Sequence, residues 1–310
     1  MDKVLLYLLK KKDFVSGEEI SENLSISRTA VWKHMKMAKE NGFEIESVAG
    51  KGYRIKKFPP DRLISELIYS EFSDIPCEII YLKEVDSTND YAKRNIANLN
   101  DRDYLIITDK QTKGRGRFDR VWESSEGKDL TFSLILHPAI EIKYFYNFTI
   151  MASLAVYETL KFLPENEKLK IKWPNDLYYE NKKLCGILSE MISEEAILKS
   201  LIIGVGINVN SISRLQNAIS LHEITGKELD RHLLLSSFLK NFYHFYSGKK
   251  EWEKIFAEWK KNLKNLGEIV KFRVHENTIT GKFIDVSSDG TIVIETDSET
   301  LSFYSGEFLS

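Results

Sequence analysis

The sequence predicts an α+β protein built from more than one domain. A chain of 310 residues, 43% of them apolar, is long enough for about two hydrophobic cores. Helix signals fill the first 40 residues, strands and helices alternate through the middle, and strand patterns dominate the last 44 residues. We expect an N-terminal domain over residues 1–60, a central α/β domain over 65–265 and a C-terminal β domain over 267–310.

The charge balance separates the head of the chain from its body. Residues 1–57 contain 12 Lys and Arg but 8 Asp and Glu, so this segment is basic. The whole chain carries a net charge of −2, so the remainder is acidic. A small basic head on an acidic body is typical of a DNA-reading module joined to another activity.

Helix-capping signals organise the first segment. Ser16 and Glu19 have the spacing of a capping box, and Ser27 is placed to cap the helix that follows. In that helix Val31 and Met35, four residues apart, would face the core. Its outward residues would be Arg28, Thr29, Trp32, Lys33 and Lys36.

Two helices joined by a tight turn, the second polar and basic at its start, describe a helix-turn-helix from Gly17 to Lys36. Two alternating runs, residues 43–48 and 52–55, then predict a β-hairpin wing. We expect this winged helix-turn-helix to bind DNA. The alternative is a helical domain whose charged face is merely solvated.

Phe58-Pro59-Pro60 breaks the pattern and marks a linker. Beyond it, the apolar runs 104–107, 130–136 and 201–205 indicate buried strands, and 145–162 and 233–246 indicate helices. From Gly267 apolar residues alternate, and Asp289-Gly290 signals a hairpin turn. The last segment is therefore predicted to be an SH3-like β-barrel.

Several enzyme classes lose support because their motifs are missing. The sequence has no GxxxxGK[ST] phosphate loop, no HExxH and no GxSxG, and Gly204-Val-Gly206 lacks the third glycine of a dinucleotide fingerprint. Cys77 and Cys185 form no CxxC pair, which argues against a structural zinc site or a disulfide framework. No apolar run approaches the roughly 18 residues of a membrane span, and the N-terminus lacks a signal-peptide cleavage site. We expect a cytoplasmic protein without a membrane partner.

The segment Lys113-Gly-Arg-Gly-Arg117 suits an anion. Alternate glycines let the backbone approach a ligand closely, and the arginines supply fixed, fork-shaped donors. Such a loop could cover a triphosphate or an acyl phosphate. The alternative is a mobile surface loop with scattered charge.

A second segment, Lys172-Trp-Pro-Asn-Asp176, is followed by Lys183-Leu-Cys-Gly186. The Trp-Pro step places Asn175 and Asp176 at a turn, where their side chains could reach a ligand. Lys183 precedes apolar residues, and a desolvated lysine requires an anion such as a carboxylate or phosphate. The alternative is an ordinary exposed lysine.

The third segment, Asp86-Ser-Thr-Asn89, follows a strand-like run. Its hydroxyls and amide offer neutral donors and acceptors for a polar ring such as a ureido group. Its other reading is a helix N-cap for residues 90–96, and both roles can coexist.

In this order and spacing, the segments resemble the biotin–protein ligases of the bifunctional, repressor-bearing type. The resemblance covers essentially the whole chain and implies a central domain of the biotin-ligase, class II synthetase-like kind. The residues that carry it are Ser87-Thr-Asn89, Gln111, Gly114-Arg-Gly-Arg117, Trp122, Lys172-Trp-Pro-Asn-Asp-Leu177, Lys183-Leu-Cys-Gly186, Gly206-Ile-Asn-Val209 and Gly306-Glu307.

The resemblance also implies roles for these residues. The biotin site would consist of Ser87, Thr88, Asn89, Gln111, Arg115, Gly116, Arg117 and Lys183. The nucleotide site would consist of Trp122, Lys172, Asn175 and Asn208. Catalysis would depend on Lys183, Arg117 and Asp176, the last with a supporting role in positioning or metal binding; no dedicated metal ligands are expected. One residue departs from the family loop, because Asp119 stands where a glycine is usual.

The reaction implied is that of an AMP-forming biotin–[acetyl-CoA-carboxylase] ligase. It would use ATP, biotin and Mg²⁺, and its partners would be the acceptor lysine of a biotin carboxyl carrier protein and operator DNA, with a homodimer when adenylate is bound. Two alternatives remain: a lipoate-type ligase, whose Lys-x-x-Gly-x-Ala pattern is broken here by Leu188, and a biotin-sensing repressor without catalysis.

Overall fold

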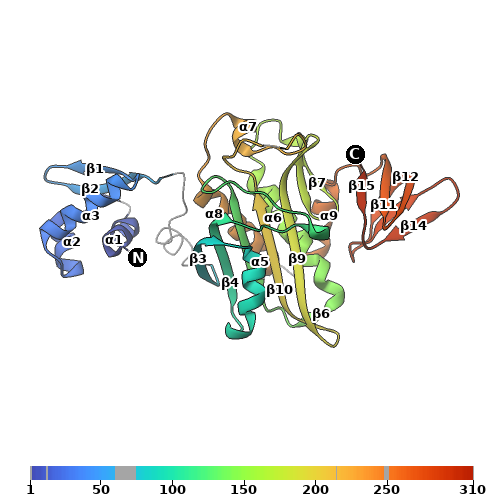
Figure 1. Ribbon diagram of the computed structural model, residues 1–310, viewed down its shortest axis with the longest axis horizontal. Helices are drawn as coiled ribbons and strands as arrows, with labels where there is room; N and C mark the ends of the chain where they lie inside the picture. Colours follow the sequence, from blue (N-terminus) through green and yellow to red (C-terminus); the bar gives the residue numbers. More distant parts are fainter. Residues whose placement is uncertain (1, 12, 60–74, 214, 248–250, 310) are drawn as a thin grey trace.

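A computed structural model of the chain describes residues 2–11, 13–59, 75–213, 215–247 and 251–309, which form three units in chain order (Figure 1). The first contains α1 (Lys3–Lys11), α2 (Gly17–Leu24), α3 (Arg28–Glu40), β1 (Glu44–Val48) and β2 (Gly52–Lys57). Val31 and Met35 are buried, as expected, so the winged helix-turn-helix is confirmed. Pro60 of the expected linker and residue 65, the expected start of the central domain, lie outside the described residues.

Serine side chains begin both helices of the helix-turn-helix. Ser16 Oγ accepts from Glu19 N at 3.0 Å, and Ser27 Oγ accepts from Ala30 N at 3.1 Å. The other half of the expected capping box, in which the Glu19 side chain would accept from the backbone N–H of Ser16, is wrong. The Glu19 carboxylate contacts α1 instead. It accepts from Tyr7 Oη at 3.0 Å and lies 3.0 Å from Lys11 Nζ, which ties α2 to α1.

The central unit is built on one mixed sheet. Its strands are β3 (Cys77–Val85), β4 (Asp103–Gln111), β5 (Leu130–Leu136), β6 (Ile140–Glu141), β7 (Leu169–Lys172), β8 (Asp176–Tyr179), β9 (Lys182–Glu194) and β10 (Ile197–Ile207). They lie in the order β3-β4-β5-β10-β9-β8-β7, with β6 paired to β10. Only the β3–β4 pair is parallel among the strand pairs of the described central residues.

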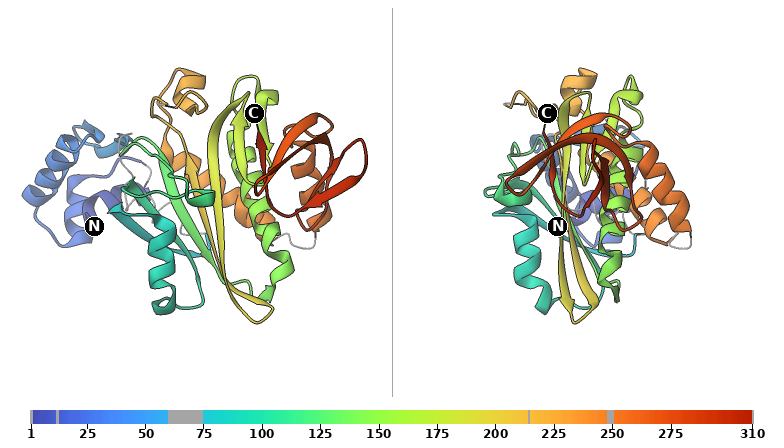
Figure 2. Two further views of the ribbon diagram at one scale, coloured as in Figure 1. Left: turned by 45° about the vertical axis from the view of Figure 1, so that its right-hand side comes forward. Right: turned by 90° about the vertical axis from the view of Figure 1, so that its right-hand side faces the viewer.

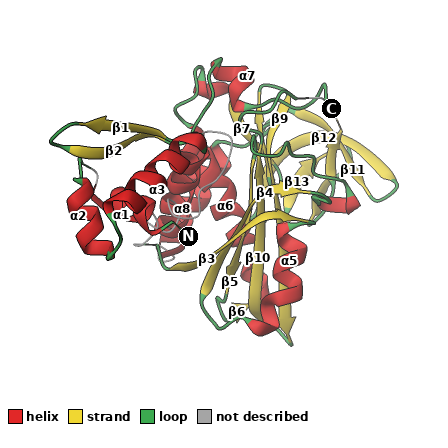
Figure 3. Cartoon of the chain, turned by 60° about the vertical axis from the view of Figure 1, so that its left-hand side comes forward, coloured by secondary structure: helices red, strands yellow, loops and turns green. Residues whose placement is uncertain are grey.

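Helices cover both faces of this sheet (Figures 2 and 3). On one face α5 (Thr88–Asn95) packs over Ile106 and Ile202. On the other, α6 (Phe145–Leu160), α8 (Arg231–Ser247) and α9 (Trp252–Lys261) enclose the larger core. The middle strands are therefore buried on both sides, which explains why their sequences are continuous apolar runs rather than alternating ones.

Shorter elements connect these layers. They are α7 (Leu221–Thr225) and the 3₁₀ turns Ile96–Asn98, Arg117–Asp119, Ile142–Tyr144 and Asn166–Lys168. No helix within the described residues is both long and apolar enough to cross a membrane.

The C-terminal unit is an antiparallel sheet whose first and last strands pair. It contains β11 (Ile269–Val274), β12 (Asn277–Val286), β13 (Ile292–Glu295), β14 (Thr300–Phe303) and β15 (Glu307–Leu309) in the order β14-β13-β12-β11-β15. This agrees with the predicted small β-barrel domain. Trp173, in the turn between β7 and β8, packs on Phe272 and Phe308 and donates from Nε1 to the Gly290 carbonyl at 2.9 Å. This contact fixes the β domain beside the central sheet.

Candidate active site

A cavity of about 960 Å³ opens where the start of α5 and strands β4, β8, β9 and β10 meet the C-terminal β15. Its size is at the upper end for small-molecule sites, which span roughly 300–1,000 Å³. The structure brings every expected ligand-site residue to its wall: Ser87, Thr88, Asn89, Gln111, Arg115, Gly116, Arg117, Trp122, Lys172, Asn175, Asp176, Lys183 and Asn208.

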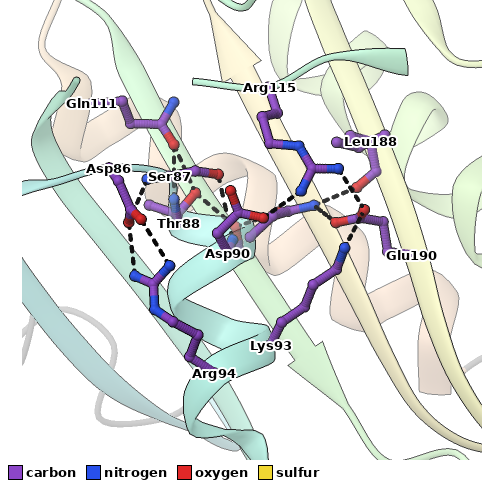
Figure 4. Close-up of polar contacts among 12 residues, drawn as sticks. Asp86, Ser87, Thr88, Asp90, Lys93, Arg94, Gln111, Arg115, Leu188 and Glu190 are labelled. Carbon is purple, nitrogen blue, oxygen red and sulfur yellow. Dashed lines mark hydrogen bonds and ion pairs between the residues drawn. The ribbon is translucent and has the colours of Figure 1, made fainter. Parts of the chain in front are cut away.

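Ser87, Thr88 and Asn89 are buried at the start of α5. Ser87 Oγ is directed at Asp90 N, 3.4 Å away, so this serine is the N-cap as well as a cavity residue. Gln111, at the end of the neighbouring parallel strand β4, accepts at Oε1 from Thr88 N at 2.8 Å and from Thr88 Oγ1 at 3.2 Å (Figure 4). The ends of two parallel strands thus bring four uncharged polar side chains together.

The Ser133 side chain contacts both Thr88 and Asn89. Its hydroxyl lies 2.7 Å from Thr88 Oγ1 and 2.6 Å from Asn89 Oδ1 and is fully buried in β5. Sequence reasoning missed this residue. The available signal was a lone hydroxyl inside the apolar run 130–136, since a buried hydroxyl needs a hydrogen-bond partner.

Two glycines of β10 leave room for cavity side chains. A Cβ on Gly204 would lie 2.3 Å from Asn89 Oδ1, and a Cβ on Gly206 would lie 2.3 Å from Trp122 Cε2. The Gly204-Val-Gly206 sequence, which fails as a dinucleotide motif, therefore has a different physical purpose. Both glycines admit a neighbouring side chain to the face of the sheet.

The segment after β4 folds back on itself over the cavity. Gly116 N donates to Arg120 O at 2.7 Å, and Trp122 N donates to Gly114 O at 2.9 Å. At its tip Phe118 and Asp119 have φ values of +55° and +56°. Asp119 thus occupies a left-handed conformation that glycine adopts without steric cost.

The three arginines of this loop have different environments. Arg115 pairs with Asp90 and lies 3.4 Å from Glu190 Oε1. Arg120 makes a bidentate contact with Glu307 of β15, at 2.6 and 2.7 Å, and this contact lowers the pKa of Glu307 to about 2. Arg117 lines the cavity and is part-buried, and this burial lowers the pKa of its guanidinium.

Lys183 has an anionic partner within the chain. Its Nζ lies 2.6 Å from Asp176 Oδ2 and 5.7 Å from the centre of the Trp122 ring. Lys172 lies on the same wall, where its Nζ donates to the Phe308 carbonyl at 3.4 Å. Burial lowers the pKa of Lys172.

The two asparagines expected at the nucleotide, Asn175 and Asn208, donate hydrogen bonds to backbone carbonyls. Asn175 Nδ2 donates to the Ile187 carbonyl. Asn208 Nδ2 donates to the carbonyls of Lys183 at 3.4 Å and Ile219 at 3.1 Å. These amides therefore brace the segment that carries Lys183 while they line the cavity.

Trp122 leaves one polar atom unsatisfied. Its Nε1 is buried and has no hydrogen-bond partner within the described residues. A buried N–H without a partner is costly, so this atom is available to a ligand in the cavity. Within the same residues there is no group of three His, Cys, Asp or Glu side chains that could hold a metal ion on their own.

Comparison with known proteins decides what this cavity belongs to. Family models match residues 81–208 (biotin/lipoate A/B protein ligase family), 1–54 (HTH domain) and 266–309 (biotin protein ligase C-terminal domain). The bifunctional ligase/repressor BirA of Bacillus spizizenii is 34% identical over 99% of this chain and 97% of its own. The chain belongs to the bifunctional biotin–protein ligase family.

Two further relatives extend this biotin–protein ligase comparison. The Escherichia coli bifunctional ligase/repressor BirA is 28% identical over 98% of this chain and 95% of its own. Among solved structures, the Aquifex aeolicus biotin protein ligase in complex with biotin and ATP is 34% identical and has a TM-score of 0.63. The match covers 75% of this chain and 97% of that one.

The residues of α3 that were expected to point outward do so. Arg28, Thr29, Trp32, Lys33 and Lys36 are all exposed. Trp32 is 55% exposed, and Lys36 Nζ lies 5.7 Å from the centre of its ring. Arg28 pairs with Glu18 of α2, and Lys36 Nζ lies 3.9 Å from Glu40 Oε1 within α3.

Proposed function

We propose that the cavity of this biotin–protein ligase carries out both halves of the ligation under one loop. The observation that carries the proposal is the division of its wall. Uncharged donors and acceptors gather at Ser87–Asn89 and Gln111, and the cations Lys172 and Lys183 line the cavity from β7 and β9. A ureido ring suits the first group, and carboxylate and phosphate oxygens suit the second.

In the first half-reaction a carboxylate oxygen of biotin attacks the α-phosphorus of ATP. The new O–P bond replaces the bond to pyrophosphate, which leaves. Negative charge gathers on the phosphoryl oxygens in the transition state, so Lys183 and Arg117 stabilise it by fixed positive charge. Trp122, Lys172, Asn175 and Asn208 position the nucleotide.

In the second half-reaction the ε-amine of a carrier lysine attacks the acyl carbon of biotinyl-5′-AMP. An amide C–N bond forms, the C–O bond to AMP breaks and the amine loses its proton. Correct placement of the two reactants supplies much of the acceleration. The acceptor we propose is the lysine of a biotin carboxyl carrier protein.

Mg²⁺ accompanies the nucleotide in this proposal. It binds proteins through one or two carboxylates plus substrate phosphates, and Asp176 offers such a carboxylate beside Lys183. When bound there, the ion would neutralise negative charge on the phosphates.

The direct experiment incubates the protein with labelled biotin, Mg-ATP and a biotin carrier domain, and then omits each component in turn. We expect label on the carrier lysine only in the complete mixture. Lipoate in place of biotin should give no product. Biotin binding without any ATP turnover would replace the proposal with a biotin-sensing repressor that lacks catalysis.

We also propose that the winged helix-turn-helix, residues 1–60, joins a catalytic domain over 65–265 and a C-terminal domain over 267–310 in a cytoplasmic repressor. A palindromic operator is read by a two-fold dimer, so the adenylate-bound chain would act as a homodimer. DNA footprinting on the promoter of the gene that encodes this protein should show protection that strengthens with biotin and ATP. Lys33→Ala should weaken that protection, whereas Lys10→Ala on α1 should not.

A further inference from the structure

Glu190 of β9 holds groups from two parts of the site (Figure 4). Its Oε2 accepts from Asn89 Nδ2 at 2.9 Å. Its Oε1 lies 2.6 Å from Lys93 Nζ and 3.4 Å from Arg115 Nη2. The side chain is only 17% exposed, so these contacts are partly shielded from water.

The hydrogen bond to Glu190 Oε2 fixes the orientation of the Asn89 amide. Asn89 Nδ2 also donates to the Leu188 carbonyl at 3.1 Å, so two acceptors on β9 hold the NH₂ end of the amide. Asn89 Oδ1 is then left facing Ser133, 2.6 Å away. The two ends of an amide have opposite hydrogen-bonding sense, so this orientation sets the donor and acceptor pattern of the pocket.

Through its other oxygen, Oε1, Glu190 helps to hold the loop over the cavity. The Arg115 guanidinium bridges Asp90 of α5 and Glu190 of β9. With Lys93, these side chains make a cluster of two cations and two carboxylates, whose formal charges cancel. Arg115 is therefore occupied in anchoring the loop rather than in supplying free positive charge.

We infer that Glu190 is a positioning residue that links the orientation of the Asn89 amide to the anchoring of the covering loop through Arg115. The inference rests on the proposed function, because it takes the Asn89 pocket as the place of the biotin ring. Glu190 touches no reacting atom in this scheme. It acts through its two neighbours.

The variants Glu190→Gln, Glu190→Ala and Lys93→Ala separate the contact of Glu190 with Asn89 from its contact with Arg115. In Glu190→Gln the amide oxygen still accepts from Asn89, but the charge that attracts Arg115 is gone. We expect biotin affinity within about threefold of wild type and roughly tenfold faster release of biotinyl-5′-AMP. In Glu190→Ala, biotin affinity should also fall by roughly tenfold.

Lys93→Ala is the matched control, because Lys93 contacts the same carboxylate from the more exposed side. It should leave both biotin affinity, measured by calorimetry, and the adenylate release rate unchanged. If Lys93→Ala reproduced the losses of Glu190→Ala, the inference would be wrong, because any disturbance of the cluster would then have the same effect.

Double-mutant cycles give the decisive readout. Glu190→Ala and Asn89→Ala should be non-additive in biotin affinity, and Glu190→Ala and Arg115→Ala should be non-additive in adenylate release. A purely structural role would lower the melting temperature and give additive effects in both cycles, which would overturn the inference.

The same data separate this inference from the proposed function. If Asn89→Ala weakens biotin binding but its cycle with Glu190→Ala is additive, Glu190 has no positioning role and the pocket assignment stands. If Asn89→Ala leaves biotin affinity unchanged in an active ligase, the pocket assignment and the inference both fail.

Discussion

Lys183 of β9 and Asp176 of the neighbouring strand β8 form an ion pair, with 2.6 Å between Nζ and Oδ2. The two side chains are 32% and 23% exposed, so the pair lies in the cavity wall rather than in open solvent. The anion that a part-buried lysine requires is thus supplied by the chain itself. A carboxylate or phosphate ligand must share Lys183 with Asp176 or replace Asp176 beside it.

Lys183→Ala should abolish most adenylate formation. It removes a cation from the place where charge gathers on the phosphoryl oxygens, and the loss of one such group costs about 10²–10³-fold in rate. Biotin-dependent ATP–pyrophosphate exchange measures this step, and biotin binding should weaken as well. Lys182→Ala, at an exposed neighbouring position, is the control. Normal exchange in Lys183→Ala would refute the catalytic role.

Arg117→Gly should release adenylate before the carrier arrives. The guanidinium is part-buried over the cavity, and a hydrogen bond to a charged group is worth about 1.5–3 kcal/mol, or roughly ten- to a hundredfold in release rate. The measurement is biotin on the lysines of an added bystander protein. Lys113→Gly, at an exposed position in the same loop, should remain selective. Unchanged selectivity in Arg117→Gly would count against a retaining loop.

Gly204→Ala and Gly206→Ala should weaken the binding of different substrates. The first places a methyl group against Asn89 Oδ1 and the second places one against the Trp122 ring. Displacements of about 1 Å at such contacts can cost about 10²-fold. We expect the KM for biotin to rise selectively in Gly204→Ala and the KM for ATP to rise selectively in Gly206→Ala. Equal changes in both constants would mean that the two halves of the cavity are not separate.

Lys172 should produce an alkaline limb in the pH profile. Burial lowers its pKa below the usual 10.5, so as pH rises it loses its positive charge earlier than an exposed lysine does. If that charge holds the nucleotide, the KM for ATP rises through this lowered pKa. Lys172→Arg, which keeps its charge, should move the limb to higher pH. Lys170→Arg on the same strand should leave it in place, and an unmoved limb in Lys172→Arg would exclude Lys172 as its source.

Local features of the fold could be predicted from the sequence because their causes are local. Ser27 caps α3 by a bond to a backbone amide three residues away, and the run 130–136 is a strand because both its faces are buried. The β domain followed from its alternation and from a turn at Gly290, where φ is +85°.

Contacts between distant segments could not be predicted, because they depend on register and packing. Arg120 meets Glu307 across the contact between the central unit and the β domain, where Trp173 also bonds to Gly290. Glu190 meets Asn89 because α5 packs on β4, β5 and β10, next to β9. Ser133 carried a usable signal, since a hydroxyl in an apolar strand needs a partner, but the sequence does not say which partner.

The most direct test of the account is a search for biotinyl-5′-AMP itself. The purified protein is mixed with biotin and Mg-ATP in the absence of a carrier, and protein-bound product is quantified by mass spectrometry. We expect about one adenylate per active site, lost on addition of a carrier domain and nearly absent in Lys183→Ala. A wild-type protein that binds both substrates but forms no adenylate would contradict the account.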